Sequence, residues 1–256
     1  MRFATSPACR ALLLWVPFFC VTAAWAQTAA TAASCQAVSA PNPPTVVELY
    51  TSEGCSSCPP ADRWLSTLKG RSDVVALAFH VTYWDRLGWP DRFALPEGTA
   101  RQHQLAQLAG SRQVYTPQVM ANGKDWPQWH RAPLASPSAV GPSPSAVTVR
   151  LARTGQQVTA EVGAVPSHPA AQFSGYWAVL EDQHESKVRA GENAGQTLRH
   201  DHVVRLYQPV AAWAAAAGSS HRITVSPGVA QQPRRVVFVV NDGATQKPVQ
   251  AVVLAC

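Results

Sequence analysis

The sequence lacks the features that indicate binding to nucleic acid or insertion into a membrane. Charged residues make up only 14% of the 256 residues, and the 21 Lys and Arg form no basic block or stripe. Because nucleic-acid binding needs such a concentration of positive charge, we expect no nucleic-acid partner. Beyond the first 26 residues, no apolar run approaches the roughly 18 residues that a membrane-spanning helix requires. We therefore expect no stable membrane insertion once the N-terminal segment is removed.

Residues 1–26 have the pattern of a secretory signal peptide. Arg2 and Arg10 accompany a short apolar run, which ends at the small-x-small sequence Ala24-Trp25-Ala26. This is the order of a charged region, an apolar region and a cleavage site. We therefore expect cleavage of this segment and a periplasmic or secreted protein, in surroundings where disulfides persist.

Cysteine is scarce, with six in the chain and two of them in the predicted signal peptide. The four that remain are Cys35, Cys55, Cys58 and Cys256, for which three pairings are possible in principle. Cys55 and Cys58 are neighbours in sequence. That leaves Cys35 and Cys256, near the two ends of the mature chain, for a structural disulfide that would tie both ends. The alternative is that these two are free or bond to other molecules.

Residues 45–131 alternate strand patterns with helical patterns. The expected elements are a strand at 45–50, a helix from the double proline to Gly70, a strand at 73–85, a helix at 96–110, and a strand with a hairpin turn at Asn122-Gly123. This order predicts an α/β unit with a partly parallel sheet and right-handed crossovers.

The flanking segments differ from this unit in composition. Residues 27–44 are rich in Ala, Thr and Pro and predict an extended N-terminal lead. Residues 132–146 contain four prolines and predict a linker. Residues 147–256 carry regularly spaced β-forming runs. The predicted fold class is therefore α/β, a mixed sheet with flanking helices followed by a smaller, mainly β domain.

The segment "TSEGCSSCPPAD" follows the first predicted strand and opens the first predicted helix. At a helix start, the i, i+3 spacing of Cys55 and Cys58 places both sulfurs on one face, within reach of a disulfide. The positive end of the helix would stabilise a Cys55 thiolate, whereas the charge of Glu53 would oppose it. Pro59 and Pro60 fit best if Cys58 caps the helix. The spacing predicts a redox pair in which one cysteine attacks a disulfide and the other resolves the mixed disulfide.

The order of strand, Cys-x-x-Cys and helix is similar to that of the thioredoxin-like superfamily. More closely, the segments "ELYTSEGCSSCPPAD", "HVTYWDRLGWPD", "YTPQ" and "ENAGQTLRHDHVVR" resemble an exported bacterial family of thioredoxin-like proteins whose function has not been assigned. The resemblance covers most of the mature chain and implies a thioredoxin-like domain over residues 45–131. It also implies a cis peptide bond at Thr116-Pro117, beside the dithiol.

The resemblance implies roles for particular residues. Cys55 would attack the substrate and Cys58 would resolve the mixed disulfide. Glu48, in an apolar strand, would be a buried acid that exchanges a proton with Cys58, the alternative being a solvent-facing strand residue. The backbone at Thr116 would pair with the substrate ahead of Pro117.

Two aromatic residues are further candidates for substrate binding. Trp84 belongs to an aromatic-rich segment that could present an apolar platform near the dithiol, and Tyr115 directly precedes Thr116. The alternative is that such aromatic side chains belong to the core.

We predict an exported thiol–disulfide oxidoreductase that acts on protein substrates together with a redox partner protein, without a cofactor or bound metal. The sequence does not determine the direction of electron flow. In one alternative, the same cysteines bind and deliver copper or another soft metal, with Met120 or His80 as a further ligand. In another, both disulfides are structural and the β-rich domain is a binding module.

Overall fold

The structure is a computed structural model that describes residues 1, 35–131, 134, 145–168, 171–226, 232 and 234–256. All of its described helices and strands belong to one compact unit, Ala32–Cys256. The predicted signal peptide, beyond Met1, and most of the predicted linker 132–146 lie outside the described residues. Among the residues described, no helix is both long and apolar enough to cross a membrane.

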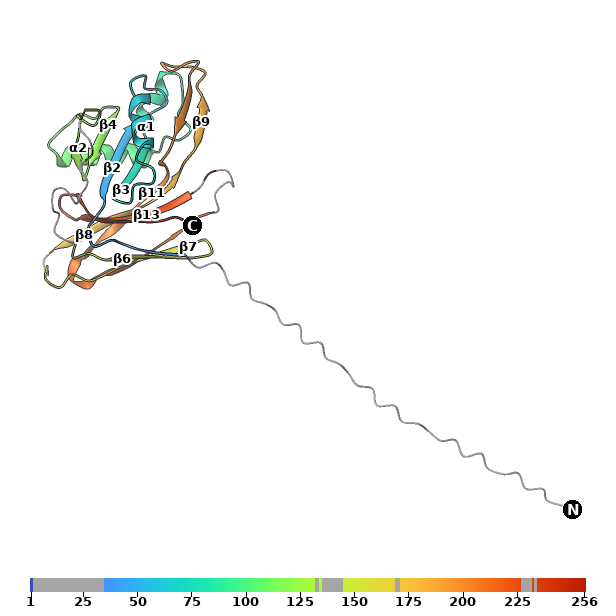
Figure 1. Ribbon diagram of the computed structural model, residues 1–256, viewed down its shortest axis with the longest axis vertical. Coiled ribbons are helices and arrows are strands. Elements are labelled where there is room, and N and C mark those ends of the chain that lie inside the picture. The colour runs from blue at the N-terminus through green and yellow to red at the C-terminus, as the bar shows by residue number, and fades with distance from the viewer. Residues whose placement is uncertain (2–34, 132–133, 135–144, 169–170, 227–231, 233) are drawn as a thin grey trace. The chain divides into compact units, whose positions relative to one another are not determined.

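Eight strands form one mixed sheet in the order β14-β13-β8-β11-β3-β2-β4-β5 (Figure 1). They are β2 (Thr45–Thr51), β3 (Val74–His80), β4 (Gln118–Ala121), β5 (Lys124–Asp125), β8 (Gln172–Glu181), β11 (Val203–Ala214), β13 (Arg234–Asp242) and β14 (Pro248–Leu254). β2 and β3 are parallel along their whole length, and β11 joins β3 in parallel where Val203 lies opposite Ala78. The remaining neighbours are antiparallel. Strands from both halves of the chain therefore share one sheet.

The two α-helices of the described residues cover opposite faces of β2 and β3. They are α1 (Pro59–Ser66) and α2 (Pro96–Leu108), and short 3-10 helices occupy η1 (Thr82–Leu87) and η3 (Ala215–Ala217). Because side chains alternate along a strand, Val47 and Leu49 pack with Leu65 of α1. Tyr50 instead packs with Leu105 of α2. The alternation decides which β2 side chains lie on the face of the cysteine-bearing helix.

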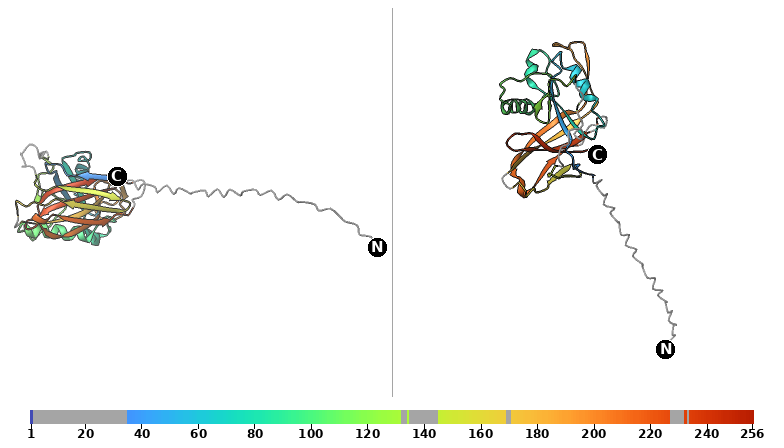
Figure 2. Two further views of the ribbon diagram at one scale, coloured as in Figure 1. Left: turned by 90° about the horizontal axis from the view of Figure 1, so that it is seen from below. Right: turned by 60° about the vertical axis from the view of Figure 1, so that its left-hand side comes forward.

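A second layer covers the other end of the large sheet. Four strands pair in the order β1-β6-β7-β12: β1 (Cys35–Val38), β6 (Val149–Thr154), β7 (Gln157–Val162) and β12 (Ser219–Thr224). Their inner side chains, such as Leu151, pack with Trp177 of β8 and Phe238 of β13, so the two layers form a sandwich (Figure 2). Cys35 of β1 forms a disulfide with Cys256, beyond the end of β14.

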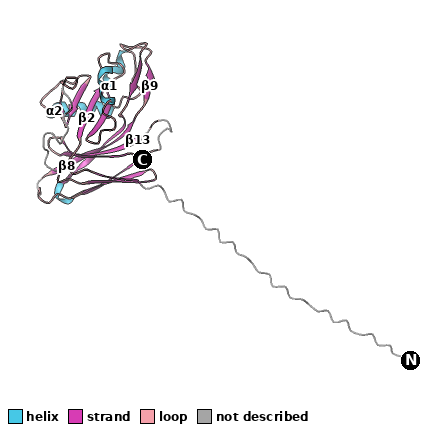
Figure 3. Cartoon of the chain, in the orientation of Figure 1, coloured by secondary structure: helices cyan, strands magenta, loops and turns pink. Residues whose placement is uncertain are grey.

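The predicted fold class is wrong. Strands dominate the described chain (Figure 3), and the arrangement is mainly β instead of an α/β thioredoxin-like sheet followed by a smaller β domain. The cause is the pairing of β11 with both β3 and β8, which extends the sheet of the first half with strands from the second. The predicted division at residues 132–146 stays a prediction.

Local elements agree more closely with the sequence. The helix expected at 96–110 is α2, whereas the first helix ends at Ser66 and turns occupy the residues up to Gly70. The hairpin turn between β4 and β5 has positive φ at Asn122 and Gly123, 46° and 73°. Asn-Gly favours this conformation because both residues tolerate positive φ.

Candidate functional site

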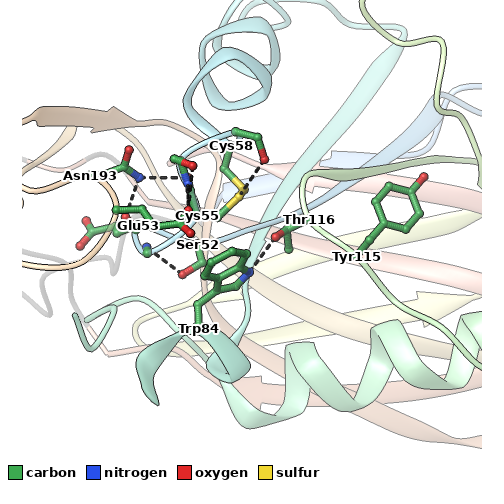
Figure 4. Close-up of a disulfide and its surroundings, with 12 residues drawn as sticks. Ser52, Glu53, Cys55, Cys58, Trp84, Tyr115, Thr116 and Asn193 are labelled. Carbon is green, nitrogen blue, oxygen red and sulfur yellow. Dashed lines mark hydrogen bonds between the residues drawn. A yellow bond between two sulfur atoms is a disulfide. The ribbon is translucent and has the colours of Figure 1, made fainter. Parts of the chain in front are cut away.

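The Cys55–Cys58 disulfide lies in the connection between β2 and α1 (Figure 4). The Cα atoms of the two cysteines are 5.4 Å apart. Cys58 is the N-cap of α1, and Pro59 and Pro60 take the first two helical positions. A proline there removes N–H groups that would have no partner within the helix. The double proline therefore fits because Cys58 caps the helix, and Cys55 lies outside it.

The turn exposes its serines and buries its cysteines. Cys55 and Cys58 are both 0% exposed, whereas Ser56 and Ser57 are exposed. The Ser57 Oγ lies 3.4 Å from the Cys55 Sγ, within hydrogen-bonding distance of sulfur. A thiolate that attacks either sulfur can therefore do so only after the turn shifts.

A hairpin from the second half of the chain holds this turn. The strands β9 (His184–Lys187) and β10 (Thr197–His200) pair with each other, and we call the segment between them, residues 188–196, the hairpin tip. Glu192 accepts hydrogen bonds from the Ser56 N–H (3.0 Å) and Oγ (2.7 Å). The Asn193 amide donates to the carbonyl oxygens of Glu53 (2.8 Å) and Cys55 (2.9 Å). The hairpin tip thus fixes the backbone on both sides of Gly54 and at Ser56.

The residues predicted to bind substrate lie at different distances from the disulfide. Figure 4 shows Thr116 and Trp84 beside it, and the Trp84 indole N–H donates to the Thr116 Oγ1 over 2.7 Å. The Thr116-Pro117 peptide bond is cis. Tyr115 lies farther away, with its hydroxyl turned from the disulfide and bonded to Asp125 (2.9 Å). Thr116 and Trp84 therefore lie with the cysteines, Pro117 follows Thr116 in the chain, and Tyr115 lies at the edge.

Glu48 is buried, but on the sheet face opposite α1. Its carboxylate accepts hydrogen bonds from Arg101 of α2, at 2.6 Å for Nη2. The Tyr50 and Tyr176 hydroxyls each donate to it over 2.8 Å. These three residues satisfy the carboxylate in the core between the sheet and α2. The predicted proton exchange between Glu48 and Cys58 stays a prediction, and it would have to cross the sheet.

A cluster of buried ionisable side chains lies on the same side of the sheet as α1 and around the cysteine turn. The His80 Nδ1 is 2.6 Å from the Asp91 Oδ2, and this oxygen also accepts the Glu53 N–H over 2.8 Å. The Trp89 indole donates to the Glu53 carboxylate over 2.7 Å, and the His200 Nε2 lies 3.3 Å from its other oxygen. The cluster joins the connection after β2, the end of β3 and the end of β10.

Burial and neighbouring charge act against each other in this cluster. Burial raises the pKa of Asp91, but the charge and hydrogen bond of His80 outweigh it and lower that pKa to about 2. Burial lowers the pKa of His80, yet Asp91 raises it above the ordinary value. Burial also raises the pKa of Glu53, while the neighbouring side chains of His200, Ser186 and Trp89 outweigh it and leave that pKa lowered. Glu53 is therefore an anion tied to its partners, and its side chain faces the cluster.

The metal-binding alternative finds no support in this geometry. In the part of the chain that the structure describes, no group of three or more His, Cys, Asp or Glu is placed to hold a metal. Met120 packs in the core between the sheet and α2, and His80 is bonded to Asp91.

A family model matches residues 46–241, more than half of the chain. The chain belongs to the DUF1223 family. This family is described as one of unknown function, as was the family that the sequence motifs resemble. The thioredoxin-like assignment receives no such support. A comparison with curated proteins gives no match.

Two solved structures are similar to this DUF1223 protein. Protein AGR_C_4864 from Agrobacterium tumefaciens is 27% identical, with a TM-score of 0.62 over 82% of this chain and 93% of that one. HBP35 of Porphyromonas gingivalis has a TM-score of 0.52 over 83% of this chain and 75% of that one. At 15% identity, the second likeness concerns the fold alone.

Sequence reasoning missed the residues that the second half of this DUF1223 chain brings to the turn. Glu192 and Asn193 belong to the segment "ENAGQTLRHDHVVR", which carries the family resemblance but predicts no role for these two residues. His200, in the same segment, reaches Glu53. Asp62 was also missed, although its position four residues after Cys58 was a readable signal, because i and i+4 share one face of a helix.

Proposed function

We propose that this DUF1223 protein is a thiol–disulfide oxidoreductase that acts on proteins outside the cytoplasm through the Cys55–Cys58 pair. The observation that carries the proposal is the Cys55–Cys58 disulfide at the start of α1, with the Ser57 hydroxyl 3.4 Å from the Cys55 sulfur. A hydroxyl at this distance can donate to a thiolate when the pair is reduced. Membership of the DUF1223 family does not itself indicate an activity, because the family is described as one of unknown function.

Cys55 is the attacking cysteine and Cys58 the resolving one. Cys55 lies outside α1, in the turn that carries the exposed Ser56 and Ser57, whereas Cys58 is the buried N-cap of the helix. A shift of the turn would bring Cys55 to the surface before Cys58. The mixed disulfide with a substrate then forms at Cys55, and Cys58 attacks it from within.

Thr116 and Trp84 border the place where a substrate would lie. Both are half-buried and lie beside the disulfide. An extended substrate segment could pair with the backbone at Thr116, while Trp84 supplies apolar contact. A second protein must return the pair to its starting redox state after each cycle.

Trapping of mixed disulfides tests the proposal. In Cys58→Ala, produced with its own N-terminal segment, substrates should stay bonded to Cys55, because the resolving thiol is gone. Non-reducing electrophoresis and mass spectrometry of the captured bands measure this. The matched control is Cys55→Ala/Cys58→Ala, which has the same helix cap but no attacking thiol. Equal capture by the two variants would refute the proposal.

A further inference from the structure

Asp62 lies one helical turn after Cys58. The backbone of Cys58 has helical angles, φ −77° and ψ −36°, so i, i+4 geometry applies and the two Cβ atoms are about 5–6 Å apart. The Asp62 N–H also bonds to the Cys58 carbonyl oxygen at 3.1 Å. Cys58 is 0% exposed and Asp62 is 7% exposed. A carboxyl group is therefore buried on the helix face that carries the resolving cysteine.

Asp62 differs from Glu53 and Asp91, the other buried acids near the turn, because each of those lies within ion-pair distance of a histidine, whereas no ion pair among the described residues includes Asp62. Burial raises the pKa of Asp62, and the charges of His200 and His80 only partly oppose this, so the pKa stays above its ordinary value. The ionisable groups that interact with Asp62 or line its cavity are Asp91 from a loop, His80 from β3, His200 and Arg199 from β10, and Arg63 of α1 itself. A buried carboxyl whose pKa is raised is better suited to accept and return a proton than one whose pKa is lowered.

A small cavity gives Asp62 a route to solvent. It has a volume of about 150 Å³ and is lined by Asp62 and His200 together with the exposed Arg63 and Arg199. Within the described chain, three buried ring nitrogens of the cluster, His80 Nε2 and both nitrogens of His200, have no hydrogen-bond partner. The cavity therefore brings solvent to the Asp62 side chain, on the helix that Cys58 caps.

We propose that Asp62 exchanges a proton with Cys58 during thiol–disulfide exchange, an inference that rests on the proposed function. In the reducing direction, the Cys55 thiolate attacks a substrate disulfide, and the first substrate thiolate leaves and takes a proton from solvent. Cys58 then gives its proton to the Asp62 carboxylate, and the Cys58 sulfur attacks the Cys55 sulfur of the mixed disulfide. The second substrate thiolate leaves and takes up a proton that Asp62 returns. Two electrons pass from the dithiol to the substrate, and the oxidising direction reverses each step.

Glu48 lies farther from Cys58 than Asp62 does, because it is on the opposite face of the sheet. Its carboxylate lies beyond the sheet and is bonded to Arg101 and two tyrosine hydroxyls. Asp62 is on the near face and on the same helix as Cys58. The geometry thus separates a structural acid from one placed for proton transfer.

The test compares Asp62→Asn with Asp242→Asn, which makes the same chemical change at the last residue of β13, far along the chain from the site. In a Cys55→Ser background, alkylation of Cys58 is followed against pH. Without the nearby negative charge, the pH midpoint should fall by about one unit or more in Asp62→Asn, and it should stay unchanged in Asp242→Asn. In the protein with both cysteines, Asp62→Asn should slow resolution of a Cys55–glutathione mixed disulfide about tenfold or more at pH 7.

The outcomes separate the two proposals. If the alkylation midpoint and the resolution rate of Asp62→Asn equal those of the parent protein, Asp62 has no part in the proton transfer, whatever the exchange activity. If the midpoint shifts but the parent protein exchanges with no disulfide substrate, the oxidoreductase function fails while the coupling of Asp62 to Cys58 stands. Circular dichroism of each variant checks that the fold is retained.

Discussion

At the scale of single residues, the buried acids Glu48, Asp91 and Asp62 differ in their cationic partners. This difference separates structural acids from the one that we assign to proton transfer. Glu48 is paired with Arg101 at 2.6 Å, and the guanidinium also stacks 4.3 Å from the Tyr176 ring centre. Asp91 is paired with His80. Asp62 has histidine charges near it but forms no salt bridge within the described part of the chain, which is why it is the acid assigned to proton transfer.

The Glu48–Arg101 pair predicts a large loss of stability when one member is removed. Arg101→Met should lower the free energy of unfolding by about 3–5 kcal/mol, because it leaves the Glu48 charge buried without its partner. Urea unfolding measures the loss, and Arg112→Met, at an exposed site, is the matched control. Exchange by the surviving folded protein should be unchanged. A loss below about 1 kcal/mol would contradict the structural role.

The Asp91–His80 pair predicts a pH dependence of stability. Asp91 has a pKa lowered from 3.8 to about 2, so between these values the unfolded chain binds more protons and stability falls as the solution is acidified. The difference corresponds to about 2 kcal/mol. The pKa of His80 is raised, so its contribution is present below pH 6.5 and is lost as the pH rises through the folded value. Urea unfolding from pH 2.5 to 8 should show both slopes, and both should flatten in Asp91→Asn.

At the scale of elements, the hairpin tip between β9 and β10 holds the cysteine turn in place. Asn193 is buried and its amide satisfies two carbonyl oxygens, those of Glu53 and Cys55. Glu192 binds Ser56 from an exposed position. The turn should therefore depend more on Asn193 than on Glu192.

Asn193→Ala should lower the free energy of unfolding by about 1–3 kcal/mol, because it leaves buried carbonyl oxygens without a donor. It should also speed reduction of the Cys55–Cys58 disulfide by dithiothreitol, because the turn shifts more easily once it is released. Glu192→Ala should have the smaller effect on both. Equal reduction rates in the parent protein and Asn193→Ala would show that the hairpin tip does not control access.

At the scale of the whole molecule, the sequence predicts local segments well and the sheet poorly. β2, α2 and the Asn122-Gly123 turn follow from strand and helix patterns and from turn chemistry. The pairing of Val203 with Ala78 cannot be predicted from local patterns, because it depends on packing between segments far apart in sequence. For the same reason Cys55 and Cys58 could be found by their spacing, whereas Asn193 could not.

The second disulfide belongs to this scale, because it joins the first strand to the end of the chain. Cys35 and Cys256 are 221 residues apart in the sequence. Cys35 begins β1 of the four-stranded layer, and Cys256 follows β14, so both lie in other elements than the Cys55–Cys58 turn. Replacing both with Ser should lower stability by about 2–5 kcal/mol. Exchange through Cys55 and Cys58 should stay unchanged, and a loss of exchange in a folded double variant would contradict the separation of roles.

The reduction potential of the Cys55–Cys58 pair tests the central claim most directly. The unmodified chain is equilibrated with glutathione or dithiothreitol buffers, and mass spectrometry counts the alkylated form of the peptide that carries both cysteines. Structural disulfides typically have potentials below about −300 mV, and catalytic ones lie above this. We predict a value above about −300 mV for Cys55–Cys58 and a lower one for Cys35–Cys256. A Cys55–Cys58 potential as low as that of Cys35–Cys256 would make the pair a structural staple and contradict the account.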